Sequence, residues 1–253
     1  MSCRTLAIMN QKGGAGKTTT AEALAAGLTL KGYSVLSVDL DAQCNMTYTA
    51  RAKTSGATAL GVLTGEIKAE DAIQHTESGD LIPASKALAG ADAVIADTGK
   101  EYRLREALEP LQARYDFILL DTPPALGILS INALAACDSV IIPAQADIYS
   151  LQGIEQLAET MKPVKKYCNP ALRIEGILLT RYSPRSVLSR EVAELAERIA
   201  AKLGTKLFKT TIREAVAVRE AQISQRILYS YAPRAKVTED YNHFIEELLR
   251  EES

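Results

Sequence analysis

The chain has 253 residues, of which 47% are hydrophobic and 24% are charged, and its formal net charge is −2. These values are typical of one soluble globular domain, and the lack of an apolar run of about 18 residues or of a signal peptide argues against a membrane-spanning or secreted protein. The cysteines, at positions 3, 44, 137 and 168, form no C-x-x-C pair, so we expect reduced thiols in a cytoplasmic protein.

Short apolar runs alternate with longer segments of helical periodicity, which predicts an α/β fold with a mainly parallel, twisted sheet flanked by helices. Strands are expected at Leu6–Met9, Ser34–Asp39, Asp116–Asp121, Ser139–Pro143, Arg173–Thr180 and, more weakly, Lys206–Phe208. Helices are expected at Lys17–Lys31, Glu101–Arg114, Ile128–Ala136, Leu151–Lys166, Ser189–Leu203 and Thr238–Arg250. Segment 44–100 is less regular, and there we expect short helices around Leu81–Pro83. No linker divides residues 1–253, so a single domain is predicted.

The sequence NQKGGAGKTTT lies between the first expected strand and the first expected helix, which is the context of a phosphate-binding loop. Glycines let successive backbone N–H groups converge on phosphate oxygens, and the helix N-terminus adds its dipole. Lys17 should reach the β- and γ-phosphates, and the Thr18 hydroxyl should ligate Mg²⁺. The usual pattern, G-x-x-x-x-G-K-[ST], has glycine where this chain has Gln11, and it does not require Lys12. The expected nucleotide-binding residues of the loop are Gly13, Gly14, Ala15, Gly16, Lys17, Thr18 and Thr19.

Carboxylates follow two further expected strands. Asp121 ends the apolar run Phe117–Leu120, as a Walker B aspartate does, and we expect it to bind Mg²⁺ together with Thr18. Asp39 and Asp41 follow the second strand, at the edge where ligands bind in open α/β sheets. We therefore expect Asp39 near the metal as well, although a strand-end cap is an alternative for this residue.

The motifs KGGAGKTTT, VDLDAQCN, FILLDTPPALGILSINAL and VIIPAQADIYSLQGIEQL together resemble the ParA group of deviant Walker A ATPases. The resemblance runs from the first strand to about Leu157 and continues more loosely to the end of the chain. It implies a single-domain P-loop NTPase that uses ATP and Mg²⁺ with weak intrinsic turnover.

The same resemblance implies a role for the second lysine of the loop. Lys12 would reach across a dimer interface to the partner's nucleotide, so that ATP is sandwiched between two subunits. Asp41 would position or activate the attacking water, and Asp121–Pro124 with Gly127 would form a switch that senses the γ-phosphate. The chain departs from the family at Ala15, at Ala42 and at Cys44, where valine, proline and glycine respectively are usual.

Residues 162–236 carry 16 Lys or Arg and only 6 Asp or Glu, which fits either a polyanion-binding surface or solvated helix faces. ParA dimers bind DNA without sequence specificity, and the resemblance implies such a role for Arg185. A second family arginine falls on Ala217, so we expect the neighbouring Arg213 and Arg219 to substitute for it. For the nucleotide base, Thr180, Arg181 and Arg213 are candidates, with ordinary strand-end residues as an equally good alternative.

Other members of the clan fit less well. The acidic C-terminal segment lacks the basic face of a membrane-binding helix, so no membrane partner is expected. The scattered cysteines make a metallocluster reductase a weaker alternative, and we expect no N-terminal helix-turn-helix extension. The predicted function is a cytoplasmic, nucleoid-associated partition ATPase. It would act on double-stranded DNA with a ParB-like centromere-binding protein that stimulates hydrolysis. The alternative is a ParA-like positioner or regulator of a protein cargo.

Overall fold

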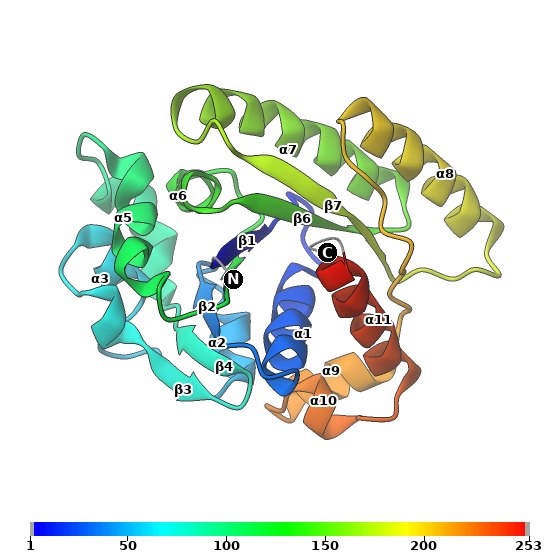
Figure 1. The fold of residues 1–253 in the computed structure, drawn as a ribbon, viewed down its shortest axis with the longest axis horizontal. Helices are drawn as coiled ribbons and strands as arrows, with labels where there is room; N and C mark the ends of the chain where they lie inside the picture. The colour runs from blue at the N-terminus through cyan, green and yellow to red at the C-terminus, as the bar shows by residue number, and fades with distance from the viewer. Residues whose placement is uncertain (1–2, 251–253) are drawn as a thin grey trace.

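A computed structural model describes residues 3–250 and contains a seven-stranded sheet (Figure 1). Along the sheet the strands follow the order β3-β4-β2-β5-β1-β6-β7, and only the pairing of β3 with β4 is antiparallel. Parallel strands need crossover connections, and helices supply most of them here. The strands are β1 (Arg4–Ile8), β2 (Val35–Asp39), β3 (Gln74–Thr76), β4 (Gly79–Ile82), β5 (Phe117–Asp121), β6 (Ser139–Gln145) and β7 (Arg173–Thr180).

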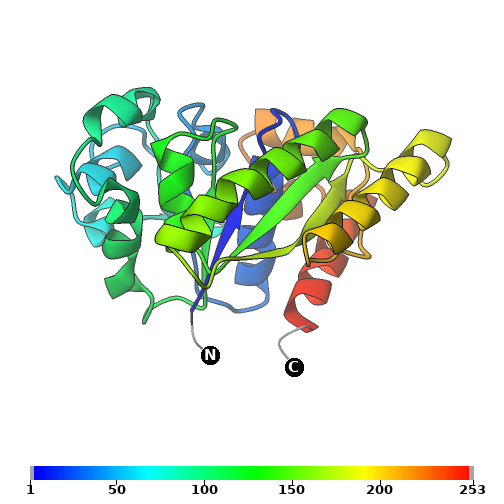
Figure 2. The ribbon, with the colours of Figure 1, turned by 90° about the horizontal axis from the view of Figure 1, so that it is seen from above.

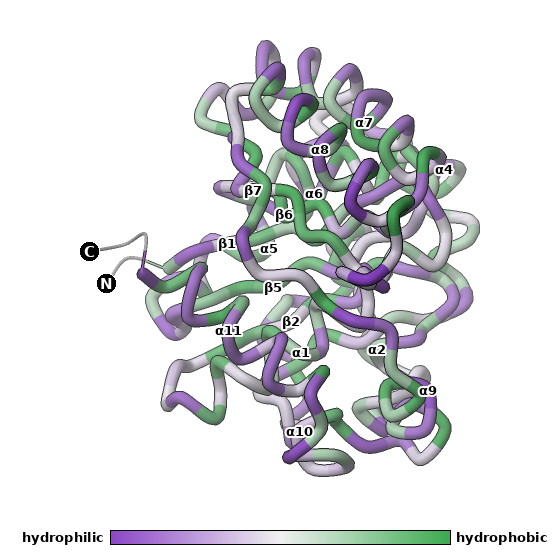
Figure 3. Tube along the Cα trace, turned by 90° about the vertical axis from the view of Figure 1, so that its right-hand side faces the viewer, coloured by the Kyte–Doolittle hydropathy of each residue, from purple (hydrophilic) through white to green (hydrophobic). Residues whose placement is uncertain are grey.

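Helices cover both faces of the sheet and bury two apolar clusters. One cluster lies under α3, α5, α6, α7 and α8, and the other lies under α1, α10 and α11 (Figure 1). The central strands between them are mostly hydrophobic, whereas α8 and α11 carry many hydrophilic residues (Figure 3). The α-helices are α1 (Lys17–Leu30), α2 (Asn45–Thr49), α3 (Ala59–Thr64), α4 (Ala91–Val94), α5 (Arg103–Leu108), α6 (Ile128–Ala136), α7 (Ile148–Tyr167), α8 (Val187–Lys202), α9 (Val216–Ile223), α10 (Leu228–Tyr231) and α11 (Lys236–Arg250).

The register of the strands brings the predicted site residues to one edge of the sheet. Asp39, at the end of β2, lies opposite Asp121, at the end of β5. On the other side of β1, Gln145 at the end of β6 lies opposite Thr180 at the end of β7. Seen from above, the loop after β1 lies at the edge opposite to the end of α11 (Figure 2). All four side chains therefore surround the loop that joins β1 to α1.

Several predicted elements differ from the structure. Leu81–Pro83 was expected among short helices, but Leu81 and Ile82 belong to β4, which pairs with β2. This prediction is wrong because both side chains are buried against the sheet in a strand too short to show alternation. The expected helix Glu101–Arg114 is divided into α5 and flanking 3₁₀ turns, and Pro110, which cannot donate a helical hydrogen bond, lies in the second turn. Residues 206–208 form only an isolated bridge between Leu207 and Ile177.

The C-terminal helix α11 packs as its apolar rhythm predicts. Tyr241, Phe244, Ile245 and Leu248 are each at most 1% exposed, and they pack in the cluster that also contains α1 residues. The apolar face of this helix is therefore firmly docked, and of its acidic residues Asp240 is buried with it at 7% exposure.

No helix between residues 3 and 250 combines the length and the apolar character that crossing a membrane requires.

Candidate nucleotide-binding site

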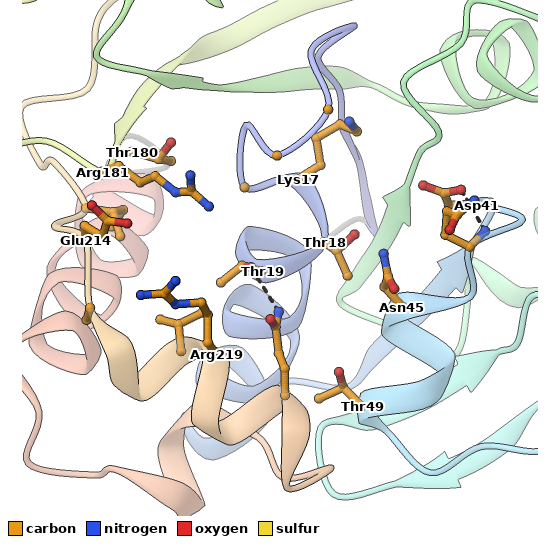
Figure 4. A pocket seen from close by; sticks show the side chains of 18 of the residues that line it. Lys17, Thr18, Thr19, Asp41, Asn45, Thr49, Thr180, Arg181, Glu214 and Arg219 are labelled. Atoms are coloured by element: carbon orange, nitrogen blue, oxygen red, sulfur yellow. Dashed lines mark hydrogen bonds between the residues drawn. The ribbon is translucent and has the colours of Figure 1, made fainter.

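A pocket of about 600 Å³ opens at the carboxyl edge of the sheet (Figure 4). At one end it is lined by the glycine-rich loop and the first turn of α1. Segments 180–181 and 212–215 and the helix α9 line the other end, and Asp41 with α2 forms a side wall. The pocket therefore joins all of the segments in which nucleotide-binding residues were predicted, apart from the buried Asp39 and Asp121 behind it.

Side chains from β6 and β7 hold two carbonyl groups of the glycine-rich loop, and Asn10, which follows β1, holds one of its N–H groups. Gln145 donates to the carbonyl of Gly14 (2.5 Å), and Thr180 donates to the carbonyl of Ala15 (2.9 Å). Asn10 accepts from the N–H of Lys12 (2.9 Å) and donates to the carbonyl of Pro143 in β6 (2.7 Å). Because these carbonyls are turned toward the protein, the loop can present its N–H groups to an anion.

Two glycines make this loop conformation possible. Gly14 and Gly16 have φ values of 76° and 93°, in the left-handed region that other residues adopt only at a cost. Gly16 is also the N-cap of α1, and its carbonyl accepts from Thr20, so the positive end of the helix dipole points at the pocket. A phosphate group is the ligand that this arrangement fits.

Lys17 is held inside the loop. Its residue is 7% exposed, and its ammonium group lies 3.4 Å from the carbonyl oxygen of Lys12. Burial lowers the pKa of Lys17, while the carboxylates of Asp121 and Asp41 oppose that change. The ammonium group of Lys17 therefore lies near two carboxylates. This arrangement is expected where a lysine and a divalent cation bind the same phosphate groups.

Asp121 is the strongest indication of a cation site. It is fully buried, and neither of its carboxylate oxygens has a hydrogen-bond partner among residues 3–250. Burial and the neighbouring Asp39 raise the pKa of Asp121 well above its ordinary value. A buried acid without partners is costly, and a cation beside it removes that cost. Mg²⁺ is usually bound by one or two protein carboxylates, and water and phosphate oxygens supply its other ligands. It therefore does not require a larger set of protein ligands.

Asp39 is buried beside Asp121, but its oxygens are already engaged. One accepts from the N–H of Asp41 (3.1 Å), and the other accepts from the N–H and the hydroxyl of Thr47 (2.9 and 2.7 Å). Burial raises its pKa to about 6 despite these hydrogen bonds. Asp39 therefore fastens α2 to the end of β2, as the strand-end alternative implied, and adds negative charge near the predicted metal.

Asp41 lies at the side wall of the pocket and is 9% exposed. Its carboxylate accepts from the N–H of Gln43 (2.9 Å), and its carbonyl accepts from the N–H of Cys44 (2.8 Å). Cys44 has a φ of 55°, a left-handed conformation that explains why glycine suits this position. The turn thus presents the Asp41 carboxylate to the same pocket as Lys17.

Lys12 is in a different environment from Lys17. Its side chain is about a third exposed and forms an ion pair of 2.5 Å with Asp147, the N-cap residue of α7. Partial burial raises the pKa of Asp147, but the hydrogen bond and charge of Lys12, together with backbone N–H groups of α7, bring that pKa below its ordinary value. Lys12 therefore lies outside its own subunit's phosphate pocket, beside the exposed start of α7.

The candidates for the nucleotide base are distributed unequally. Thr180 lines the pocket but uses its hydroxyl to hold the loop, and Arg181 extends into the pocket (Figure 4). The guanidinium of Arg213 makes two hydrogen bonds to Asp240 of α11, at 2.6 and 2.7 Å. Arg213 therefore fastens its loop to α11 rather than extending freely toward a ligand.

The three arginines predicted to bind DNA do not lie together on one open surface. Arg185 is exposed in the loop between β7 and α8. Arg219 is also exposed, but it lies on α9 and lines the pocket (Figure 4). With Arg213 paired to Asp240, Arg185 alone of the three is exposed away from the pocket.

The sequence reasoning assigned no role to several residues that shape the site. Gln145 and Asp147 lie in the motif VIIPAQADIYSLQGIEQL, where their position after a strand was an available signal. Gln222 of α9 donates to the hydroxyl of Thr19 (3.2 Å), which joins α9 to the first turn of α1. No sequence pattern indicates that contact, because the two residues are 203 positions apart.

Comparisons with known proteins agree with this geometry. The AAA domain family profile matches residues 3–174. The sporulation initiation inhibitor protein Soj of Bacillus subtilis is 40% identical over 241 residues, covering 93% of this chain and 94% of Soj. The chromosome partitioning protein ParA of Caulobacter vibrioides is 38% identical over 256 residues, covering 98% of this chain and 95% of ParA.

A solved structure supports the same relationship. The crystal structure titled cobyrinic acid a,c-diamide synthase from Mycobacterium smegmatis, with bound ADP and magnesium, is 33% identical in sequence. It superposes with a TM-score of 0.85 and covers 99% of this chain and 95% of its own. The fold prediction is confirmed, and the chain belongs to the Soj/ParA family of P-loop ATPases.

Proposed function

We propose that this chain is a partition ATPase that forms a sandwich dimer with ATP, binds DNA without sequence specificity and is released when a ParB-like partner stimulates hydrolysis. The observation that carries the proposal is the contrast between the two lysines of one loop. Lys17 is buried in its own pocket, whereas Lys12 extends outward to Asp147. A single-subunit site has no use for the outward lysine, whereas a shared nucleotide does.

The residues of the pocket fit ATP and Mg²⁺. The N–H groups of the loop and Lys17 bind the phosphates, and Thr18 with the partnerless Asp121 holds the cation. A Mg²⁺ ion bound by these residues would supply positive charge beside the phosphate oxygens. Asp41 positions the attacking water from the side wall, and a partner's Lys12 adds positive charge at the γ-phosphate.

The surface around Lys12 suits a second copy of the chain. Ile148 and Tyr149, which directly follow Asp147, are 49% and 71% exposed. Exposed apolar residues beside a charged pair are typical of a surface that becomes buried in an interface. When the copies meet across the nucleotide, Lys12 exchanges Asp147 for the partner's phosphates.

DNA binding rests on the charge of residues 162–236 and on Arg185. The excess of ten positive charges in this segment gives a local attraction for phosphates in a chain of net charge −2. Arg185 is available for this role because it is exposed in the loop before α8. Dimerisation doubles the number of such contacts on one DNA molecule, which is why ATP would control DNA binding.

A gel shift on a random-sequence duplex tests the proposal. We expect a complex with a nonhydrolysable ATP analogue, little complex with ADP, and no preference among duplexes of different sequence. A dimer that forms with the analogue yet leaves every duplex unshifted at low salt contradicts the proposal. That result would instead support a positioner of protein cargo.

A further inference from the structure

The far end of the pocket contains charged groups that phosphate binding does not use. Arg181 enters from the end of β7, Arg219 enters from α9, and Glu214 lies beside them (Figure 4). None of these three side chains has an ion pair or hydrogen bond with another side chain among residues 3–250. The fourth charged group, Arg213, is fastened to Asp240 and serves as an internal anchor.

The wall of the pocket between these groups is apolar. Ile212, Ala215 and Val218 line it, and Ile212 is only 3% exposed. The carbonyl of Ile212 accepts from the N–H of Tyr182, and its own N–H donates to the carbonyl of Leu179, so β7 holds this wall in place. An apolar wall with a guanidinium group in the same pocket provides the contacts that an aromatic base needs.

The position of α9 relative to the phosphate loop is also fixed. Gln222, one turn beyond Arg219, donates to the hydroxyl of Thr19 in the first turn of α1 (3.2 Å). Arg219 therefore extends from a helix that is bonded to the phosphate-binding turn itself. A nucleotide whose phosphates lie on the loop would direct its base toward this end of the pocket.

We infer that Arg219 and Glu214 form a purine subsite: the guanidinium of Arg219 stacks on the base, and Glu214 accepts a hydrogen bond from the exocyclic amino group of adenine. This inference rests on the proposed ATP site and assigns Arg219 to the nucleotide rather than to DNA. The negative carboxylate attracts an amino group and repels a ring carbonyl, so the subsite selects adenine over hypoxanthine.

Equilibrium titration of the full chain with ATP and with inosine triphosphate tests the subsite. Removing a stacking partner costs a factor of about 5 to 100 in affinity, so Arg219→Ala should bind both nucleotides at least about fivefold more weakly. Arg219→Lys keeps the charge but loses the plane, and it should be similarly weak. Glu214→Ala should lose the preference for ATP over inosine triphosphate, and Glu214→Gln should lose most of it, because a carboxamide can turn its amino group toward the carbonyl of hypoxanthine.

Three controls separate the possible causes. Arg198→Ala, an exposed arginine of α8 outside the pocket, should bind ATP like the unchanged chain. Equal melting temperatures without nucleotide show that the Arg219 and Glu214 variants are folded. Lys17→Ala tests the proposed nucleotide site separately, because unchanged ATP affinity in that variant would contradict the site as a whole.

The outcomes are distinct. In one outcome, Arg219→Ala binds ATP within twofold of the unchanged chain and binds DNA more weakly at saturating ATP. That result overturns the inference and assigns Arg219 to DNA binding. Full ATP affinity in Arg219→Lys overturns the stacking geometry. An unchanged ratio of ATP to inosine triphosphate affinity in Glu214→Ala overturns the assignment of Glu214.

Discussion

Lys12 and Lys17 are five positions apart, yet their surroundings differ in every respect that matters for phosphate binding. Lys17 is buried between two acids, whereas Lys12 is partly exposed and paired with Asp147. A surface ion pair of this kind contributes only about 0.2–1 kcal/mol, so it can open when a more highly charged group approaches. The pair thus keeps Lys12 ordered without preventing its transfer to a partner's nucleotide.

Asp41 is expected to act on the attacking water and not on nucleotide affinity. Asp41→Ala should therefore keep ATP binding and ATP-dependent dimerisation while phosphate release falls by about 100-fold or more. Phosphate release is measured in steady state, and dimer mass is measured by light scattering on the same preparation. Phosphate release at the unchanged rate would remove Asp41 from the mechanism.

Glu22 of α1 provides a pH-dependent prediction for stability. Burial raises its pKa to about 8, although Thr49 and Gln222 beside it partly lower it, and its Oε1 atom has no hydrogen-bond partner among the described residues. Above about pH 4.5 the unfolded chain ionises this group while the folded chain keeps it protonated, so its contribution to stability falls as pH rises toward 8.

The variant Glu22→Gln lacks this titration. Its free energy of unfolding should rise relative to the unchanged chain between pH 5 and pH 8, by about 1–3 kcal/mol. Denaturant unfolding of both proteins at the two pH values gives the difference directly. A difference that is the same at both pH values would show that Glu22 ionises normally in the folded chain.

At the scale of elements, sequence patterns predicted the parts of the fold that repeat a simple period. Residues 128–136 and α11 were predicted within two residues because their apolar positions recur on one face. The short strand β4 was missed because four residues do not reveal a period, and only its pairing with β2 defines it. Similarly, α9 is eight residues long and is held by distant contacts such as Gln222 with Thr19.

The candidate site likewise contains some residues that local sequence patterns predicted and others that only distant contacts define. The glycine-rich loop and Asp121 were predictable because strand ends and loops carry local signals. The engagement of Arg213 with Asp240 was not, since an arginine in a loop gives no sign of which distant carboxylate it meets. Residue types therefore predicted the phosphate end of the pocket, whereas tertiary contacts decide which arginines remain available at the other end.

The packing of α1 against α11 gives a test at this scale. A Cβ atom on Gly27 would lie 2.6 Å from the Tyr229 hydroxyl and even closer to Ile245, so Gly27→Ala overpacks a buried junction. We expect a loss of about 1–3 kcal/mol in the free energy of unfolding, measured with denaturant. Gly90→Ala is the matched control, because a Cβ atom there meets nothing within 4 Å. Equal stability of the two variants would show that the α1–α11 junction can accommodate an added methyl group without loss of stability.

For the whole molecule, charge is distributed unevenly, and DNA binding should depend on that distribution. Arg185→Glu reverses one exposed charge in the basic segment and should weaken ATP-dependent binding to random duplex. It should also reduce the dependence of the logarithm of affinity on the logarithm of salt concentration. Titrations at several salt concentrations measure both effects. Affinity that does not change with salt would exclude phosphate contacts as the source of binding.

ATP-dependent dimerisation with Lys12 acting in trans is the central claim, and light scattering tests it most directly. With a nonhydrolysable ATP analogue, the unchanged chain should have about twice its monomer mass of 27.3 kDa. Lys12→Ala should still bind the analogue, because Lys17 and the loop are intact, but should remain at the monomer mass. A Lys12→Ala protein that dimerises fully with the analogue would contradict the account.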